Sequence, residues 1–283
     1  MKIEDYENIV KFIRNHRGLT RDCARKLVAK YSNFQPSTLY SILNKEIQLQ
    51  MKIIHSEVFA KGRNYYTNYL EAVGRNEPVG ILLRLATQFK ICPALFARKV
   101  LEDYVKIHDK NNPNSKSLNK FLKDTSLIKD RNLAYEVYMC VLYDDQYGPI
   151  KNAISDCVGI EYEMKLEECL KERNIPYSNE DHLRLKGYDK TPDCKLEVPI
   201  AVNGFVVNWI ESKAQFGNKE THNIYIKEQF LSYWNRFGPG LVIYWFGYLD
   251  DIIQTKETRF IVMDHFPENI TYMDPTSLMT SLK

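Results

Sequence analysis

The stretch GYDKTPDCKLEVPIAVNGFVVNWIESKA, residues 187–214, decides the fold of the rear half of the chain. Within it, 198–202 and 205–214 have the character of β-strands, and Asn203-Gly204 between them is a preferred loop of a two-residue hairpin. Around this hairpin we expect helices at about 159–173 and 223–236, and strands at 241–248 and 258–264. Helix, hairpin, helix and buried strand in this order predict an α/β domain around a central mixed sheet.

The front half of the chain instead has apolar residues at helical spacing. A helix at 5–16, a short helix at 21–30 and a longer helix after Pro36 follow the order of a helix-turn-helix unit. A plain three-helix packing unit is the alternative, and a second helical set is expected beyond it. The predicted class is α + α/β, with an all-helical region at 1–150 that can divide into sub-bundles 1–62 and 77–150, followed by an α/β domain at 151–283.

Charge is divided unevenly along the 283 residues, although the net formal charge is only +3. Residues 1–150 carry 24 Lys and Arg against 16 Asp and Glu, a balance of +8, and the remainder carries 15 against 20, a balance of −5. A basic front half suits a polyanionic partner and an acidic rear half suits a cation, although solvated surfaces alone can differ this much.

Other features of the composition exclude several classes of protein. The longest apolar run falls far short of the ~20 residues of a membrane helix, and the acidic N-terminal sequence MKIEDYENIV is unlike a signal peptide. The six cysteines form no C-x-x-C pair. We therefore predict a soluble intracellular protein with reduced thiols and no membrane partner.

Three residues of the rear half can carry chemistry together: Asp193 in a Thr-Pro-Asp step, and Glu211 and Lys213 in a Glu-Ser-Lys step. Strand alternation places Glu211 and Lys213 on one face of the sheet. Two carboxylates can hold a hard divalent cation such as Mg²⁺, which polarises a phosphodiester and lowers the pKa of bound water. The lysine can orient that water and stabilise charge in the transition state. A structural charge cluster is the alternative.

Further polar residues fall in phase with these three. Glu163 lies on the flank of the apolar stripe of the expected helix 159–173, from which it can reach the edge of the site as a third carboxylate. Gln229 and Tyr233 stand four residues apart on one face of the later helix, where they can contact a nucleic-acid backbone. Ordinary surface and packing roles are the alternatives.

The strand register conflicts with a shared site unless it is corrected. A two-residue Asn203-Gly204 loop would place Asp193 opposite Ala214, so Asp193 and Lys213 would face opposite sides of the sheet. Because Pro199 cannot donate a ladder hydrogen bond, we predict a β-bulge there that restores the phase. A loop of three or five residues would have the same effect.

The same residues resemble the PD-(D/E)xK nuclease superfamily. Asp193 with Glu211-x-Lys213 is similar to its signature, and Glu163 matches the helical glutamate that precedes the signature in many members. Gln229-x-x-x-Tyr233 resembles the QxxxY element of the RecB-like branch. The resemblance implies a restriction-endonuclease-like domain and a nuclease dependent on Mg²⁺ or Mn²⁺. The expected metal ligands are Asp193, Glu211, the Ser212 carbonyl and Glu163, and the expected catalytic residues are Asp193, Glu211 and Lys213.

A narrower resemblance rests on GYDKTPD, WIESKA and FLSYWNRFGPGLVIYWFG. These segments are similar to the TPD-motif family of codanin-interacting nucleases, which is associated with congenital dyserythropoietic anaemia type I. The match is densest over about 187–247 and extends more loosely to the N-terminal helices. It implies codanin as a partner and, through it, a role in chromatin and erythroid maturation, in the nucleus and the cytoplasm.

Two hypotheses follow for the function. In the first, the chain is a metal-dependent nuclease that hydrolyses phosphodiester bonds in DNA or RNA, and the basic helical region positions the nucleic acid. The expected contacts of that region are Arg21, Arg25, Lys26 and Lys45. In the second, the chain is a nuclease-like adaptor that binds codanin, and nucleic acid as well, with little or no cleavage.

Overall fold

The structure is a computed structural model, and it describes residues 1–58, 64–108, 115–253 and 257–273. The chain divides into two compact units. One comprises Ile9–Asp156, and we call it the helical unit. The other comprises Met1–Asn8 together with Cys157–Lys283, and we call it the sheet unit.

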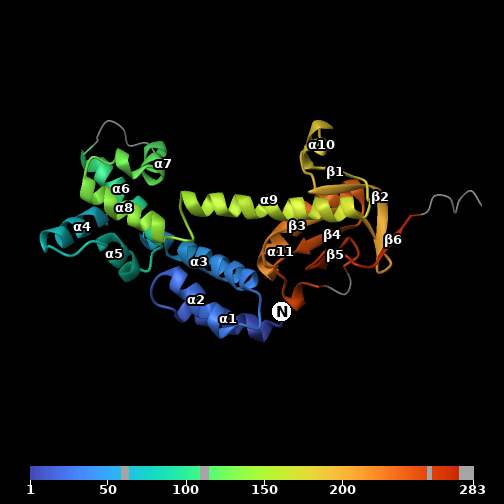
Figure 1. The fold of residues 1–283 in the computed structure, drawn as a ribbon, viewed down its shortest axis with the longest axis horizontal. Helices are drawn as coiled ribbons and strands as arrows, with labels where there is room; N and C mark the ends of the chain where they lie inside the picture. The colour runs from blue at the N-terminus through green and yellow to red at the C-terminus, as the bar shows by residue number, and fades with distance from the viewer. Residues whose placement is uncertain (59–63, 109–114, 254–256, 274–283) are drawn as a thin grey trace, which may run out of the picture. The chain divides into compact units, whose positions relative to one another are not determined.

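The helical unit contains helices in succession, as the sequence predicts (Figure 1). In chain order its elements are α1 (Ile3–Asn15, whose first residues belong to the sheet unit), α2 (Thr20–Lys30), α3 (Pro36–Val58), α4 (Tyr65–Gly74), α5 (Ile81–Phe89), α6 (Pro93–His108), α7 (Ser115–Lys123), the 3₁₀ turn η1 (Thr125–Leu127) and α8 (Arg131–Tyr143).

Two buried acids fix the ends of helices within this unit. Glu136 of α8 accepts hydrogen bonds from the main-chain N–H groups of Gly80, at 2.7 Å, and Leu82, at 3.0 Å, where α5 begins. Asp144 accepts one from the N–H of Ala94, at 2.8 Å, where α6 begins. The first N–H groups of a helix have no partner within it, so these carboxylates satisfy donors that burial would otherwise strand.

The sheet unit alternates helices and strands. Its elements are α9 (Pro149–Glu172, which begins in the helical unit), β1 (Tyr177–Asn179), α10 (Glu180–Leu185), β2 (Cys194–Val202), β3 (Phe205–Lys213), α11 (Lys219–Tyr225), the π-helical turn η2 (Ile226–Phe230), α12 (Leu231–Phe237), β4 (Gly240–Tyr244), the 3₁₀ turn η3 (Asp250–Ile252), β5 (Phe260–Met263) and β6 (Ile270–Tyr272).

These strands form one six-stranded mixed sheet in the order β1-β2-β3-β4-β5, with β6 paired to β2. The pairs among β1, β2, β3 and β6 are antiparallel, whereas β3, β4 and β5 run parallel. All five residues of β4 are buried, as its continuous apolar sequence predicts. The predicted α + α/β class and central mixed sheet are thereby confirmed.

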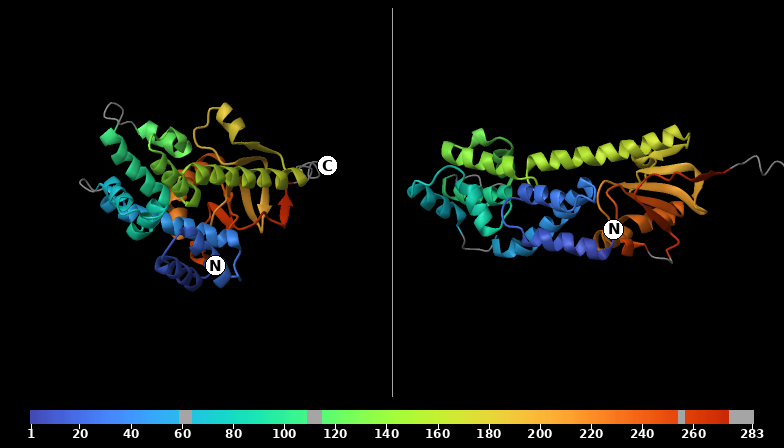
Figure 2. Two further views of the ribbon diagram at one scale, coloured as in Figure 1. Left: turned by 60° about the vertical axis from the view of Figure 1, so that its left-hand side comes forward. Right: turned by 60° about the horizontal axis from the view of Figure 1, so that its bottom comes forward.

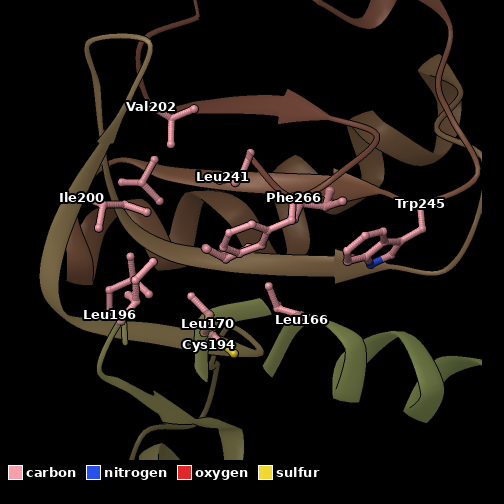
Figure 3. Close-up of a cluster of buried hydrophobic side chains, with 13 residues drawn as sticks. Leu166, Leu170, Cys194, Leu196, Ile200, Val202, Leu241, Trp245 and Phe266 are labelled. Carbon is pink, nitrogen blue, oxygen red and sulfur yellow. The ribbon is translucent and has the colours of Figure 1, made fainter. Parts of the chain in front are cut away.

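The core of the sheet unit lies between α9 and one face of the sheet. Leu166 and Leu170 of α9 point toward Leu196 and Cys194 of β2 (Figure 3). The C-terminal part of α9 runs along the sheet in the two further views of Figure 2 as well. The opposite face carries Trp209 of β3, whose ring packs against residues of η2 and α12. The sheet is therefore covered on both faces, with the hairpin strands inside.

Several elements differ from expectation. Helix α9 begins at Pro149, ten residues before the expected helix 159–173. Its first turns leave Ile150 and Ile154 exposed, so they have no buried apolar stripe that would mark a helix in the sequence. The expected helix 223–236 is interrupted by the π turn η2. Strand β1 and helix α10 are too short to give a periodic signal in the sequence. Among the described residues, no helix is long and apolar enough to cross a membrane.

Candidate active site

The β2–β3 hairpin positions the candidate site. Val202 pairs with Phe205 across the two-residue loop, and both loop residues have positive φ, 50° for Asn203 and 79° for Gly204. A loop with two left-handed residues matches the twist of the flanking strands, which is why Asn-Gly is favoured there. The predicted hairpin is confirmed, including its loop length.

The predicted bulge is also confirmed. Ile200 pairs with Val207 in the phase set by the loop, but Lys195 pairs with Trp209. Five residues separate the two pairing positions on β2 and only two separate them on β3, so β2 carries three extra residues in the segment that contains Pro199. An odd number of extra residues exchanges the two faces of a strand. Asp193, next to the Cys194–Ile210 pair, therefore adjoins Glu211 rather than Ala214.

Asp193, Glu211 and Lys213 come together at this end of the hairpin. The Lys213 Nζ lies 2.6 Å from the Glu211 Oε1, and the Asp193 main-chain N–H donates to the Glu211 Oε2 at 3.3 Å. The Asp193 Oδ2 accepts a hydrogen bond of 2.7 Å from the main-chain N–H of Ser212. Each carboxylate thus uses one oxygen to accept a hydrogen bond from the main chain of the other segment, and Lys213 forms an ion pair with Glu211.

The site concentrates negative charge in a place shielded from water. Glu211 is buried, and burial raises its pKa although the nearby Lys213 lowers it. Burial and the charge of Glu211 raise the pKa of Asp193 well above its usual range, against the opposing effects of Lys213 and the Ser212 N–H. Burial alone would lower the pKa of Lys213, but the charges of Glu211 and Asp193 raise it, so the lysine stays protonated.

Lys213 is held by a third group that sequence patterns did not indicate. Its ammonium lies 4.7 Å from the centroid of the Tyr225 ring, at the end of α11. The Tyr225 hydroxyl accepts a hydrogen bond of 2.9 Å from the Gln215 side-chain amide. A cation over an aromatic face is attracted by the ring's negative quadrupole, and this attraction is strongest where water is excluded. Tyr225 and Glu211 together fix the ammonium in one place.

Two further carboxylates lie near the site. Glu163 is exposed on α9, and partial burial, Glu180 and Glu211 all raise its pKa, which places it within electrostatic range of the three central residues. Glu180 begins α10 and accepts a hydrogen bond of 3.2 Å from the Thr191 hydroxyl. The sequence analysis missed Glu180; the signal that could have found it is the cap Asn179 followed by acids in a first turn.

Ser212 faces the opposite side of the sheet from the two acids. Its hydroxyl accepts a hydrogen bond of 2.8 Å from the Trp245 indole and donates one of 3.3 Å to the main-chain carbonyl of Tyr162 in α9. The serine side chain thereby locks β3 to α9. Its main-chain N–H supports Asp193, and the role predicted for its carbonyl as a metal ligand stays a prediction.

The π turn places Gln229 and Tyr233 differently from a regular helix. Tyr233 is only 3 % exposed and packs its ring 5.2 Å from that of Trp209. Burial raises its pKa, as do the charges of Glu211 and Asp193, so Tyr233 belongs to the buried surroundings of the site. A direct contact with nucleic acid would need an exposed side chain, which Tyr233 does not have. Gln229 has a buried Oε1 without a hydrogen-bond partner.

The segment before Asp193 is anchored to α12 by polar contacts. Arg236 forms an ion pair with Asp189, donates to the carbonyl of Lys190 at 2.9 Å, and lies over the Tyr188 ring. Lys190 in turn donates to the carbonyl of Glu228 at 2.7 Å. These contacts join GYDKTPD to η2 and to the end of α12, and they hold Asp193 at the start of β2.

Gly240 is required for the close approach of β4 to β3. A Cβ at this position would lie 2.1 Å from Cε2 of the buried Trp209 ring. The Trp209 indole N–H donates to the carbonyl of Gly238 at 2.8 Å. The Trp209 side chain, from the strand that carries Glu211, therefore packs against the Gly-Pro-Gly segment, and this contact fixes β3 in the sheet.

The basic residues predicted to contact nucleic acid lie in the helical unit. Lys26 is exposed, and Arg25 is exposed with Asp22 3.6 Å away. Arg21 is half-buried, donates to the carbonyl of Leu142 at 3.1 Å and lies over the Tyr143 ring. Lys45 of α3 is half-buried. Their role as nucleic-acid contacts stays a prediction.

Fold and site together define a class: a protein with a helical unit and a sheet unit, in which a β-hairpin brings together a buried glutamate, a half-buried aspartate and a half-buried lysine. The sequence model of the family described as "Protein of unknown function TPD sequence-motif" matches residues 129–266. Curated relatives extend this match over most of the chain, and the chain belongs to the TPD-motif family of proteins named CDAN1-interacting nuclease 1.

Three of these relatives show the extent of the likeness. The Xenopus tropicalis protein named CDAN1-interacting nuclease 1 is 45% identical over 94% of this chain and 88% of its own length. The Danio rerio protein of that name is 42% identical over 94% and 89%. The Homo sapiens protein is 41% identical over 89% and 90%. No solved structure matches the chain.

Proposed function

We propose that the chain is a metal-dependent nuclease of the PD-(D/E)xK type that hydrolyses phosphodiester bonds in DNA or RNA. The observation that carries this proposal is the bulged hairpin, which brings Asp193, just before β2, together with Glu211 and Lys213 of β3. A bulge that serves only to twist an edge has no need to bring two carboxylates together in a buried place. The family name of the relatives supports the same activity.

The residues present fit a divalent cation. The carboxyls of Asp193, Glu211 and Glu163 all have raised pKa values, whereas Lys213 supplies a single positive charge among them. A bound cation would offset this excess of negative charge, and carboxylate oxygens are the ligands that Mg²⁺ and Mn²⁺ take. Among the described residues, no group of three or more acidic, histidine or cysteine side chains is gathered so that it could hold a metal ion. Main-chain, water and substrate oxygens would therefore complete the shell, as Mg²⁺ commonly requires.

Each residue of the site has a defined task in this proposal. Asp193, Glu211 and the Ser212 carbonyl would hold Mg²⁺ or Mn²⁺, and Glu163 would join the ligand shell through a bound water, since it does not form a three-acid group with the other two carboxylates. A cation held there would supply the chemistry of an activated water and a polarised phosphodiester. The Lys213 ammonium, kept protonated by its two acidic neighbours, orients the attacking water and stabilises charge on the phosphoryl oxygens. Tyr225 keeps the ammonium from turning toward bulk water.

A cleavage assay tests this proposal. Single-stranded, double-stranded and flap substrates of DNA and RNA are incubated with Mg²⁺ or Mn²⁺, and Asp193→Ala and Lys213→Ala are each expected to lower the rate on the order of a hundredfold or more. Lys186→Ala, at an exposed lysine of the same unit, is the matched control and should cleave like the wild type. Cleavage that survives either site variant would refute the assigned site.

We propose CDAN1 as a protein partner, since the relatives carry that interaction in their name, and the nucleus and cytoplasm as the place of action. The second candidate function is that of an adaptor, which binds CDAN1 with little or no cleavage. Co-purification of CDAN1 together with a complete lack of cleavage on every substrate would favour the adaptor. Cleavage lost in Asp193→Ala while CDAN1 binding persists would favour a nuclease with a separate docking surface.

A further inference from the structure

The outer face of α8 presents aromatic and apolar side chains to solvent. Tyr135, Tyr138 and Leu142 are 52 %, 47 % and 43 % exposed. They follow Arg131 at spacings of four, seven and eleven residues, so all four side chains lie along one face of the helix. We call this face the α8 stripe (α8 in Figure 1). The other face of α8 buries Leu133 and Val137 in the helical unit.

The two tyrosines form a pair. Their ring centroids lie 6.3 Å apart with an angle of 34° between the ring planes. Two neighbouring rings of this size, each about half exposed, leave faces and edges open to a planar group from outside. Single exposed apolar residues are common on protein surfaces, but a continuous row of them marks a surface that contacts something.

Positive charge stands at both ends of the α8 stripe. Arg131 is exposed at its start. At its end, Arg21 of α2 donates to the carbonyl of Leu142 at 3.1 Å and lies 4.6 Å over the ring of Tyr143. The only acidic residue in the sequence of α8, Glu136, is buried and serves the start of α5. The stripe therefore joins aromatic faces with two guanidinium groups, and α8 itself places no exposed carboxylate between them; the acids at its ends are Asp130, which caps α8, and Asp22 beside Arg21.

We propose that the α8 stripe binds single-stranded nucleic acid. Unpaired bases stack on Tyr135 and Tyr138, and the phosphates on either side contact Arg131 and Arg21. Aromatic rings flanked by basic residues are the general means of holding unpaired strands, because every base has a flat face and every nucleotide carries a negative charge. A duplex would offer only its phosphates, since its bases are stacked on one another. The ligand class rests on the proposed function, which it deepens by naming single strands as the bound form.

The test measures binding without cleavage. The full chain carrying Asp193→Asn is titrated, in EDTA, into a fluorescein-labelled 20-mer of deoxythymidine and its ribonucleotide counterpart, and anisotropy gives the Kd. Tyr135→Ala and Tyr138→Ala should each weaken binding at least about fivefold, the low end of the effect of removing one stacking ring. Phe substitutions at both positions keep the rings and should restore nearly the full affinity. Tyr40→Ala, at an exposed tyrosine of α3, is the matched control.

Salt dependence separates the phosphate contact from the stacking contact. Arg131→Gln should lower the slope of log Kd against log salt by about 0.7, the value for one phosphate contact on a single strand, whereas the tyrosine variants should leave the slope unchanged. Unaltered binding by the double variant Tyr135→Ala/Tyr138→Ala would overturn the proposal. So would a loss of CDAN1 binding in that variant with nucleic-acid binding intact, because the stripe would then be a protein interface. Since no step of this assay requires cleavage, failure of the proposed nuclease activity leaves its outcome unaffected.

Discussion

The stability of the sheet unit should depend on the protonation of one buried histidine. His222 of α11 is 3 % exposed, and its Nδ1 lies 2.9 Å from the hydroxyl of Tyr244 in β4. The rings of Phe230 and Phe260 lie about it at 6.0 and 5.8 Å. Burial lowers the pKa of His222 to about 4, although the charge of Glu257 acts in the opposite direction. The folded unit therefore holds this histidine neutral at pH values where the unfolded chain would protonate it.

The size of the effect follows from the shift in pKa. A base whose pKa falls on folding stabilises the fold fully above its unfolded value, here 6.5, and loses that contribution as the pH falls. From 6.5 to about 4 the difference is about 2.5 units, and at about 1.36 kcal/mol per unit this amounts to about 3 kcal/mol. The loss should be complete near pH 4, below which His222 is protonated in both states.

The assay uses the distribution of tryptophan. The three tryptophans, Trp209, Trp234 and Trp245, all lie in the sheet unit, so their fluorescence reports the unfolding of that unit alone. Urea unfolding is followed from pH 7.5 to pH 4 for the wild type and for His222→Gln. The difference between the two curves removes the contribution of the carboxylates, which both proteins share, and should change by about 3 kcal/mol over this range.

A second variant keeps the argument specific. His182→Gln replaces an exposed histidine of the same unit and should leave the pH dependence of the wild type unchanged. If the unfolding free energies of the wild type and His222→Gln differ by the same amount at pH 7.5 and at pH 4, the reasoning from burial is refuted. The histidine would then be protonated in the folded unit, with water or a carboxylate reaching it.

Two further predictions concern the packing and the charge of the site. Gly240→Ala should destabilise the sheet unit by about 3 kcal/mol or more in urea unfolding, because the added Cβ overlaps the buried Trp209 ring. Gly159→Ala on α9 is the control and should be neutral or slightly stabilising, because a Cβ there meets nothing within 4 Å. Equal unfolding midpoints for the two variants would contradict the close approach of β4 to β3. Mg²⁺ at a hundred times its Kd should stabilise the wild type by about 2.7 kcal/mol, and Asp193→Asn should abolish this gain. The substitution should not lower the stability of the metal-free protein, because it removes one charge from a crowded acidic site. Equal stabilisation of both proteins by Mg²⁺ would place the metal elsewhere.

The hairpin was predictable because its signals are local. Asn203-Gly204 specifies the loop, and strand alternation puts Glu211 and Lys213 on one face without reference to the rest of the fold. The bulge followed from a conflict: a two-residue loop and a shared site cannot both hold in a regular ladder. Pro199 marks the segment in which the ladder gives way, because it has no N–H to donate. Its size of three residues comes from pairing that the sequence does not display.

The remaining parts of the site depend on contacts between distant segments. Tyr225 reaches Lys213 from the last residue of α11, where the chain enters a π turn, and an extra residue in a helical turn leaves no periodic trace in the sequence. Glu180 approaches Thr191 because β1 pairs with β2 over three residues, too few for a strand signal. Tyr233 has the sequence character of a surface contact, yet the packing of α12 against Trp209 buries it. Tertiary packing decided each of these positions.

The segments that carry the resemblance to the TPD-motif family contain two kinds of residue, those that anchor the fold and those of the candidate site. Tyr188, Asp189 and Arg236 anchor the segment before β2 to α12, a task that an adaptor with no catalytic activity would need as much as a nuclease does. Matching sequence at these positions therefore reports the fold. Asp193 and Glu211 are different, since two neighbouring carboxylates with raised pKa values destabilise the metal-free fold.

An adaptor would be more stable with a neutral residue at either of these two positions, because burying charged side chains seldom stabilises a fold more than neutral packing does. Strain of this kind is a feature of sites that bind or react, where a ligand relieves it. The question of nuclease or adaptor thus reduces to one comparison: the stability of the wild type and Asp193→Asn, each measured with and without Mg²⁺. If the site is built for a cation, the wild type should be less stable than Asp193→Asn without Mg²⁺ and more stable than that variant with Mg²⁺. A structural charge cluster would lose stability on substitution under both conditions.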